Sequence, residues 1–174
     1  MTLALAIVAL ALAGSAPPAT RADPCLLAPA LRDALQQRFG STRVLKASDL
    51  FEDERKLFQA DHPGACPGIA SGKFFGAKER AATALLLLDV GSKRNVHLLV
   101  ARPAMSSWTF FDLEEMDQGS TLVLWKDGPG HYEGPRDGPR IRATNDVISL
   151  VAYEATHRVY VWTGAKFEVV WLSD

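Results

Sequence analysis

Residues 66–102 carry the strongest hydrophobic pattern of the chain, with two apolar runs separated by a short polar turn. The first run, residues 81–90, contains four consecutive leucines, and apolar residues alternate with others over residues 96–100, after the turn at residues 91–95. This arrangement is typical of a β-hairpin. Because Leu85–Leu88 would be apolar on both faces, we expect a central strand that a helix covers on one side.

Two segments before this hairpin have the three- to four-residue spacing of apolar positions that amphipathic helices show. Residues 27–39 have this spacing and Gly40 follows as a stop signal, so we predict a helix that begins near Pro29. Residues 48–58 combine a Ser-Asp pair and an acidic first turn with spaced apolar residues. This combination predicts a short second helix.

Later segments are rich in the β-branched and aromatic residues that strands favour. They are residues 107–113, 122–125, 147–153, 158–162 and 166–172. The short gaps between the last three segments predict a meander. The expected fold class is therefore α+β, a mostly antiparallel β-sheet with two hairpin regions and a C-terminal meander, packed against one or two N-terminal helices.

An acidic group begins at the end of the strand expected at residues 107–113. Its four carboxylates are Asp112, Glu114, Glu115 and Asp117. Such a group is usually a solvent-facing loop, and binding of a cation or a basic partner is the alternative.

Residues 127–139 hold four glycines and three prolines, too many for regular structure. We predict a long connection between strands, and long loops of this kind commonly carry binding residues. The side chains that it would present are those of His131, Tyr132, Glu133 and Arg136.

Aromatic side chains recur in the predicted meander. They are Tyr153, Tyr160, Trp162 and Trp171. They would form either an ordinary sheet face or a platform for a ligand. As ligand-binding candidates we take Tyr160 and Trp162 together with the four side chains of the 127–139 loop, and we expect the loop and the aromatics to lie on one surface.

The composition fits one globular domain, with 174 residues, of which 48% are hydrophobic and 22% are charged. The 19 basic and 20 acidic residues leave a formal net charge of -1. This balance gives no electrostatic reason to expect nucleic acid or an anionic membrane as a partner.

The apolar run Thr2–Gly14 is followed by two prolines and small residues, as in a secretory signal peptide. It is short for a bilayer span, which needs about 20 apolar residues, although no Lys or Arg precedes it. We expect a signal peptide at residues 1–22, cleavage after Ala22 and a single domain at residues 23–174. The protein would then be exported, periplasmic or extracellular, without a stable membrane anchor.

An even number of cysteines in an exported chain favours a disulfide, here Cys25–Cys66, with two buried free thiols as the alternative. His62 lies four residues before Cys66, which also suggests a Cys/His or zinc site. Zinc needs three or four ligands, and the other three histidines are isolated along the chain, so we expect neither a metal nor another cofactor.

The segment Gly72-Lys73-Phe74-Phe75-Gly76, followed by Ala84–Leu88, resembles a single degenerate FG-GAP or VCBS-type repeat. In that family an acidic loop binds calcium between propeller blades. Here non-acidic residues replace the carboxylates, so the resemblance does not imply calcium binding. One copy of about 20 residues does not imply a propeller. Single copies of this kind occur in exported bacterial proteins of unknown function.

No serine lies in a G-x-S-x-G elbow. The first hypothesis is therefore an exported non-catalytic domain that binds a protein or a cell-envelope component. The alternative is a small exported hydrolase that uses His131 with Glu133 or Asp137 in the 127–139 loop.

Overall fold

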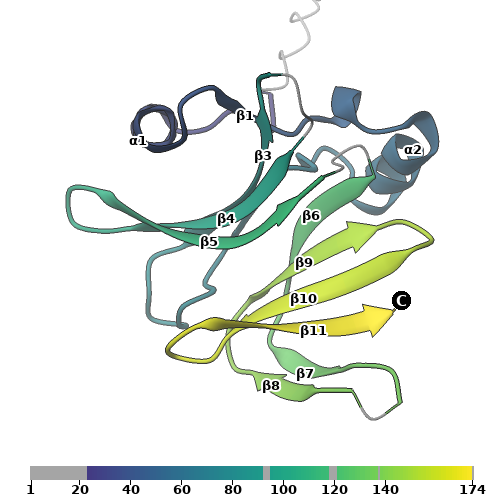
Figure 1. Cartoon of the computed structure of the whole chain (residues 1–174). Helices are drawn as coiled ribbons and strands as arrows, with labels where there is room; N and C mark the ends of the chain where they lie inside the picture. The colour runs from purple at the N-terminus through teal and green to yellow at the C-terminus, as the bar shows by residue number, and fades with distance from the viewer. Residues whose placement is uncertain (1–22, 92–94, 118–120, 137, 174) are drawn as a thin grey trace, which may run out of the picture.

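Two antiparallel sheets face each other in the computed structural model, which describes residues 23–91, 95–117, 121–136 and 138–173 (Figure 1). The first sheet contains β1 (Thr42–Val44), β2 (Ile69–Gly72), β3 (Ala82–Asp89), β4 (Val96–Pro103) and β5 (Trp108–Met116). The second contains β6 (Leu122–Asp127), β9 (Val147–Ala152), β10 (Thr156–Trp162) and β11 (Phe167–Ser173). The α+β class and the C-terminal meander β9–β10–β11 are confirmed.

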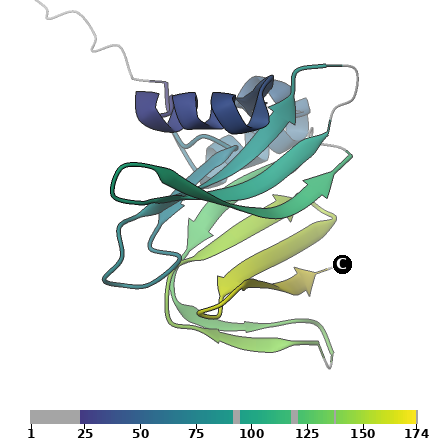
Figure 2. The same ribbon diagram turned by 60° about the vertical axis from the view of Figure 1, so that its left-hand side comes forward.

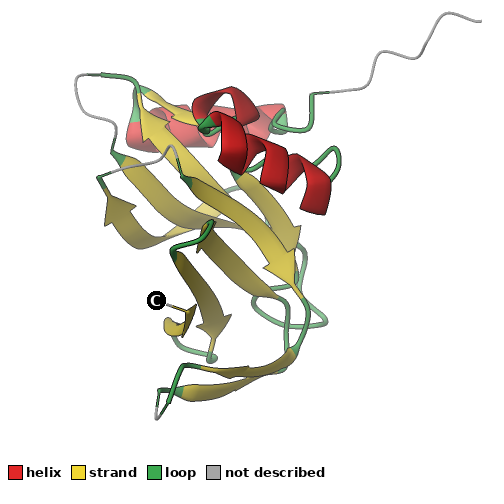
Figure 3. Ribbon diagram, turned by 90° about the vertical axis from the view of Figure 1, so that its right-hand side faces the viewer, coloured by secondary structure: helices red, strands yellow, loops and turns green. Residues whose placement is uncertain are grey.

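Two helices and a small hairpin complete the fold. The helices are α1 (Pro29–Phe39) and α2 (Glu52–Asp61), with a 3-10 turn at Ala47–Asp49 between them. The hairpin pairs β7 (Gly130–Glu133) with β8 (Arg140–Ala143). Figures 1 and 2 show α1 on the outer face of the first sheet and the hairpin on the outer face of the second. Figure 3 shows both helices at the same end of the molecule.

The leucine run of β3 is buried on both faces, as its sequence predicts. Leu85 and Leu87 belong to the core layer that includes Leu31 and Leu35 of α1. Leu86 and its alternating neighbours belong to the larger core between the two sheets. Because successive side chains of a strand point to opposite faces, one half of this apolar run packs against α1 and the other half packs against the second sheet.

The N-terminal helices follow their sequence signals. α1 begins at Pro29, as predicted, and the chain leaves it at Gly40, whose φ of 60° suits glycine. α2 has three acidic residues in its first turn and buries Phe58 in the core between the sheets. His62, just after α2, stacks on Trp125 of β6 with ring centroids 4.5 Å apart, which joins this end of α2 to the edge of the second sheet.

β1 and β2 pair in succession with the same edge of β3. Leu86 marks the junction, since its N–H donates to the Gly68 carbonyl (2.9 Å) and its carbonyl accepts from the Leu45 N–H (2.9 Å). A Cβ atom at Gly68 would lie 2.4 Å from the Leu45 carbonyl oxygen. This close approach requires glycine. The sequence reading missed both short strands.

The predicted acidic loop is wrong, because β5 continues to Met116 and carries three of the four carboxylates as strand residues. A register shift opposite Leu98 and Leu99 leaves Leu113 as an extra residue on β5. Because of this bulge, the side chains of Leu113 and Glu114 do not follow the usual alternation between the two faces of the strand. Pairing with β4 therefore extends a strand whose end looks like a loop in the sequence.

The prediction of no regular structure at residues 127–139 is also wrong. Glycines and prolines interrupt the chain on both sides of β7, but the four residues Gly130–Glu133 are free to pair with Arg140–Ala143. The hairpin packs its Tyr132 and Ile141 against Val159 and Val161 of the second sheet. Burial of this apolar side stabilises a short strand that local composition disfavours.

Candidate functional site

A groove of about 420 Å³ opens between β5 of the first sheet and β10–β11 of the second. Its lining residues are Phe111, Asp112, Leu113, Tyr160, Trp162, Ala165, Lys166, Phe167 and Val169. Two of the six predicted ligand-binding residues, Tyr160 and Trp162, are among them. Binding sites are usually clefts with apolar and aromatic walls and a few polar groups, and this groove has such aromatic walls with polar atoms in similar measure.

Alternation along β10 decides which aromatics enter this groove. Val159 and Val161 face the β7–β8 hairpin, so Tyr160 and Trp162 face the first sheet. The half-buried Trp162 lies at the centre of an aromatic cluster with Phe75, Phe111 and Phe167, at centroid distances of 4.9, 5.7 and 5.2 Å. The cluster closes the sandwich, as the core interpretation expects, and Phe111, Trp162 and Phe167 also line the groove. Its use as a platform for a ligand stays a prediction.

Glu114 links the two sheets beside the groove. Its carboxylate accepts hydrogen bonds from the Arg158 guanidinium and from the Tyr160 hydroxyl. Arg158 is only 8% exposed and lies over the ring of Trp171, 4.9 Å from the centroid. Burial and the hydrogen bond to Glu114 raise the pKa of the Tyr160 phenol well above its ordinary value, so it stays a neutral donor.

Both strands that border the groove are end strands. β5 pairs only with β4, and β11 pairs only with β10, among the strands of the described ranges. Each therefore presents one row of backbone N–H and C=O groups that its sheet does not use. On β11, Val169 and Trp171 are each 40% exposed. The groove therefore lies between two strands whose outer edges take no part in sheet pairing, although Gly134 closely approaches the Trp171 carbonyl on the β11 edge.

The other predicted ligand-binding residues lie elsewhere. His131, Tyr132 and Glu133 are on β7 and Arg136 is in the turn after it, on the hairpin that covers the opposite face of the second sheet. The expectation that loop and aromatics share one surface is therefore wrong. Strand alternation separates them, since the hairpin packs on the valines of β10 and not on its aromatic residues.

The hydrolase alternative gains no support from the neighbours of His131. His131 and Arg142 are cross-strand partners, so the side chain opposite the imidazole is a cation. Glu133 pairs with Arg140 at 2.6 Å, and Asp137 lies outside the described residues. Tyr132 is half-buried, and its hydroxyl donates to the Gly128 carbonyl at 2.5 Å.

A Ser-His-Asp group that sequence reasoning missed lies on adjacent strands of the second sheet. The Ser149 hydroxyl donates to Asp127 at 2.5 Å, and His157 Nε2 lies 3.2 Å from the same hydroxyl oxygen. Trp125 Nε1–H also donates to Asp127, at 3.0 Å. The separation of these residues along the chain gives no local signal, because only strand pairing brings them together.

This group does not have the geometry of a serine nucleophile. In a catalytic triad the carboxylate orients the histidine, and the histidine accepts the serine proton. Here the carboxylate accepts the Ser149 proton, and Ser149 is fully buried. Burial lowers the pKa of His157, which favours the neutral imidazole. We interpret the group as a satisfied polar cluster of the sheet.

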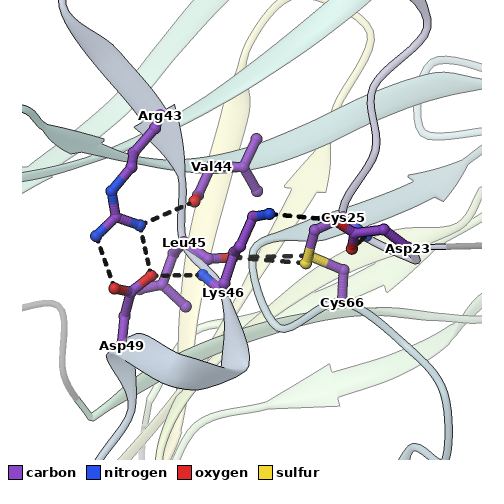
Figure 4. Close-up of a disulfide and its surroundings, with 8 residues drawn as sticks. All are labelled: Asp23, Cys25, Arg43, Val44, Leu45, Lys46, Asp49 and Cys66. Atoms are coloured by element: carbon purple, nitrogen blue, oxygen red, sulfur yellow. Dashed lines mark hydrogen bonds and ion pairs between the residues drawn. A yellow bond between two sulfur atoms is a disulfide. The ribbon is translucent and has the colours of Figure 1, made fainter.

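The predicted disulfide Cys25–Cys66 is present, and both cysteines are buried (Figure 4). It ties the segment before α1 to the segment before β2, beside the Leu45 carbonyl. Its sulfurs lie 4.0 and 3.6 Å from that oxygen. Cys66 is therefore not a free thiol, and a Cys66–His62 nucleophile is excluded.

Within residues 23–91, 95–117, 121–136 and 138–173, no three His, Cys, Asp or Glu side chains gather to hold a metal ion. No helix in these ranges is long and apolar enough to cross a membrane. No protein-family model, no curated protein and no solved structure matches the chain.

Proposed function

We propose that this protein is an exported, non-catalytic binding module that takes an extended segment of a protein of the cell envelope into the groove between β5 and β11. The observation that carries the proposal is an aromatic groove bordered by two strands that each have an unused backbone edge. An extended peptide beside such an edge gains main-chain hydrogen bonds, and pockets take its alternate side chains.

The groove offers such a segment an apolar surface that the chain itself leaves uncovered. Val169, which lines the groove, is 40% exposed, and Trp162 is half-buried. Hydrogen bonds from Arg158 and Tyr160 of one sheet to Glu114 of the other hold the two sheets together beside the groove. Binding therefore needs no large rearrangement of the sheets. Preorganisation of this kind lowers the entropic cost of binding.

Two observations support export to the periplasm or the medium. The Cys25–Cys66 disulfide fits an oxidising compartment. The apolar pattern of residues 1–22, which lie outside the described residues, is that of a signal peptide. The FG-GAP/VCBS-type resemblance of residues 72–88 supports the same placement, because such single copies occur in exported proteins.

Site-directed photo-crosslinking tests the groove. A photo-reactive phenylalanine analogue replaces Val169 in the groove or, as the matched control, Val90, which is 60% exposed after β3. After incubation with envelope extract, we expect a discrete crosslinked protein with the probe at Val169 and not at Val90. Mass spectrometry of the crosslinked peptide identifies the bound segment.

A pair of charge variants tests whether the groove provides the affinity for the crosslinked partner. Val169→Glu places a charge on the apolar lining, whereas Val90→Glu makes the same change outside it. We expect Val169→Glu to lower affinity for the crosslinked partner at least tenfold, about 1.4 kcal/mol, and Val90→Glu to leave it unchanged. Equal affinities for the two variants would exclude the groove as the binding site.

Intact-mass measurement tests export. The chain is produced with its own N-terminus in a bacterial host, and the periplasmic and medium fractions are analysed. We expect a product that begins at Asp23, with the Cys25–Cys66 disulfide formed. Recovery of only the uncleaved chain in the cytosol would contradict export.

A further inference from the structure

A second cavity, of about 260 Å³, lies between α1 and β1, on the face of the first sheet that is turned away from the groove. Its apolar lining comes from Cys25, Leu26, Leu27, Leu35, Val44 and Leu87. Leu35 and Leu87 form a closed floor, at 5% and 1% exposure, whereas Leu26 is 69% exposed. The cavity therefore has an apolar interior and an exposed leucine among its lining residues.

The charges that line this cavity are all positive. Arg32, Arg43 and Lys46 contribute to the lining, together with the neutral polar residues Gln36 and Thr42. No carboxylate is among the described residues that line it. Each of these cations has a carboxylate partner outside the lining, so an anionic group with an apolar tail complements the cavity by taking the place of one such partner.

The three cations differ in how firmly the chain already holds them. Arg43 makes a bidentate pair with Asp49, with both contacts at 2.6 Å, which raises the pKa of Arg43 and lowers that of Asp49 (Figure 4). Lys46 pairs with Asp23 at 3.1 Å. Arg32 has only a loose contact with Asp33, at 3.7 Å between side chains that are more than half exposed.

Arg32 is therefore the cation that an anionic ligand can bind with the smallest loss of existing ion-pair energy. A contact between two exposed side chains contributes little to stability, so its exchange for a ligand carboxylate is nearly neutral. The bidentate pair of Arg43 is instead a structural contact that braces β1 against the 3-10 turn. Lys46 can share its ammonium donors between Asp23 and a second acceptor, because an ammonium group has three.

The walls of the cavity are held in place without a ligand. The disulfide fixes Cys25 to Cys66, and the Cys25 N–H donates to Asp23 Oδ1 at 2.9 Å (Figure 4). On the other side, α1 is anchored by the burial of Leu31 and Leu35. A preformed apolar cavity binds an alkyl chain with little cost of reorganisation.

We propose that this cavity binds a medium-chain alkyl carboxylate, with the chain among the leucines and the carboxylate at Arg32. The volume exceeds the roughly 150 Å³ of an engineered apolar cavity that binds benzene. It is smaller than the common range of about 300–1,000 Å³ for drug-sized ligands. Both limits favour one alkyl chain of about eight to ten carbons. This site is independent of the groove between β5 and β11.

Calorimetric titration of the full chain with four defined amphiphiles tests the ligand class. The probes are octanoate, decanoate, decanol and decyltrimethylammonium, each below its micelle concentration. We expect one decanoate per chain. Two added methylene groups should tighten decanoate relative to octanoate about tenfold. Decanol should bind more weakly than decanoate, and decyltrimethylammonium should bind more weakly than decanol.

Matched variants on α1 locate the site. Gln36→Trp places a large ring at a lining position that is exposed, and Gln37→Trp makes the same change at its exposed neighbour, outside the lining. We expect the first to weaken decanoate binding at least tenfold and the second to leave it unchanged. Arg32→Gln should weaken decanoate binding about fivefold. The same change at Arg80, which is exposed and outside the lining, should leave decanoate binding unchanged.

Leu26→Asp supplies a test that does not depend on the helix. Leu26 is exposed, so the substitution spares the core, and its carboxylate should repel decanoate and reverse the preference toward the decyl cation. Absence of decanoate binding would overturn the proposal. Equal affinity for all four amphiphiles, or unchanged binding to Gln36→Trp, would do the same. Binding to phosphatidylglycerol vesicles without binding to decanoate would identify a membrane surface as the ligand instead.

Discussion

Glu114 is the residue on which the candidate groove most depends. It comes from a segment that looks like a solvated acidic run, yet its carboxylate binds both Arg158 and Tyr160 across the sandwich. The Arg158 side chain is 9% exposed and that of Glu114 is 32% exposed. A charge as buried as that of Arg158 is costly without its partner.

We therefore predict that Glu114→Gln destabilises the chain by about 2 kcal/mol, because the Arg158 cation loses its counter-charge while the partly exposed amide still accepts a hydrogen bond. The urea midpoint at constant slope measures the loss. The matched control is Glu115→Gln at the next, exposed position, where the side chain accepts a hydrogen bond from Asn95 at 3.0 Å. It should cost less than about 0.5 kcal/mol. Equal losses would contradict a structural role for the bridge.

His157 gives a pH-dependent prediction. Burial lowers its pKa in the folded chain, against the opposing effect of the Asp127 carboxylate. In the unfolded chain the pKa of this histidine has its ordinary value of about 6.5, so below that pH the unfolded chain binds more protons than the folded chain. The stability contributed by neutral His157 is therefore complete above that pH and is lost as the pH falls through the folded pKa.

His157→Gln should remove this part of the acid sensitivity. We expect the urea midpoint of the parent chain to fall more between about pH 7.5 and about pH 5.5 than that of the variant. The same measurement on His131→Gln, at an exposed position, should reproduce the parent slope. A parent and a His157→Gln variant with identical pH dependence would contradict the assignment.

At the scale of elements, the junction of β1 and β2 on β3 shows how one residue permits a strand arrangement. Gly68→Ala should destabilise the chain by about 2 kcal/mol or more, because its Cβ would lie 2.4 Å from the Leu45 carbonyl oxygen and force the backbone apart. Gly91→Ala is the control, since a Cβ there meets nothing within 4 Å. Thermal unfolding of both variants checks the prediction, and a Gly68→Ala variant as stable as Gly91→Ala would refute the close packing.

At the scale of the whole molecule, the disulfide connects the N-terminal segment to the edge of the first sheet. The cysteines are 41 residues apart, and closing a loop of that length stabilises a fold by up to about 4 kcal/mol in the chain-entropy model. We predict that the Cys25→Ala, Cys66→Ala double variant unfolds at lower urea concentration than the oxidised chain. Reductant should lower the midpoint of the parent chain and leave that of the double variant unchanged.

Sequence patterns determined most of the elements of this fold. The start of α1, the β3–β4 hairpin and the meander follow from hydrophobic period and from stop signals such as Gly40. The pairing Cys25–Cys66 follows because only two cysteines are available. The short strands β1, β2, β7 and β8 were missed, since strands of three or four residues contain too few positions to show a period.

Only the tertiary structure decided which side chains share a surface. The sequence identifies Tyr160 and Trp162 as aromatic strand residues, but the groove exists because β5 and β11 end their sheets on the same side of the sandwich. His131 and its neighbours were expected beside them and lie behind the second sheet. The hydrophobic period of a strand is visible in the residues of that strand alone. The residues that share a binding surface depend on which sheet each strand joins and which of its faces points into the core. That choice is made by long-range pairing and core packing, which no local pattern encodes.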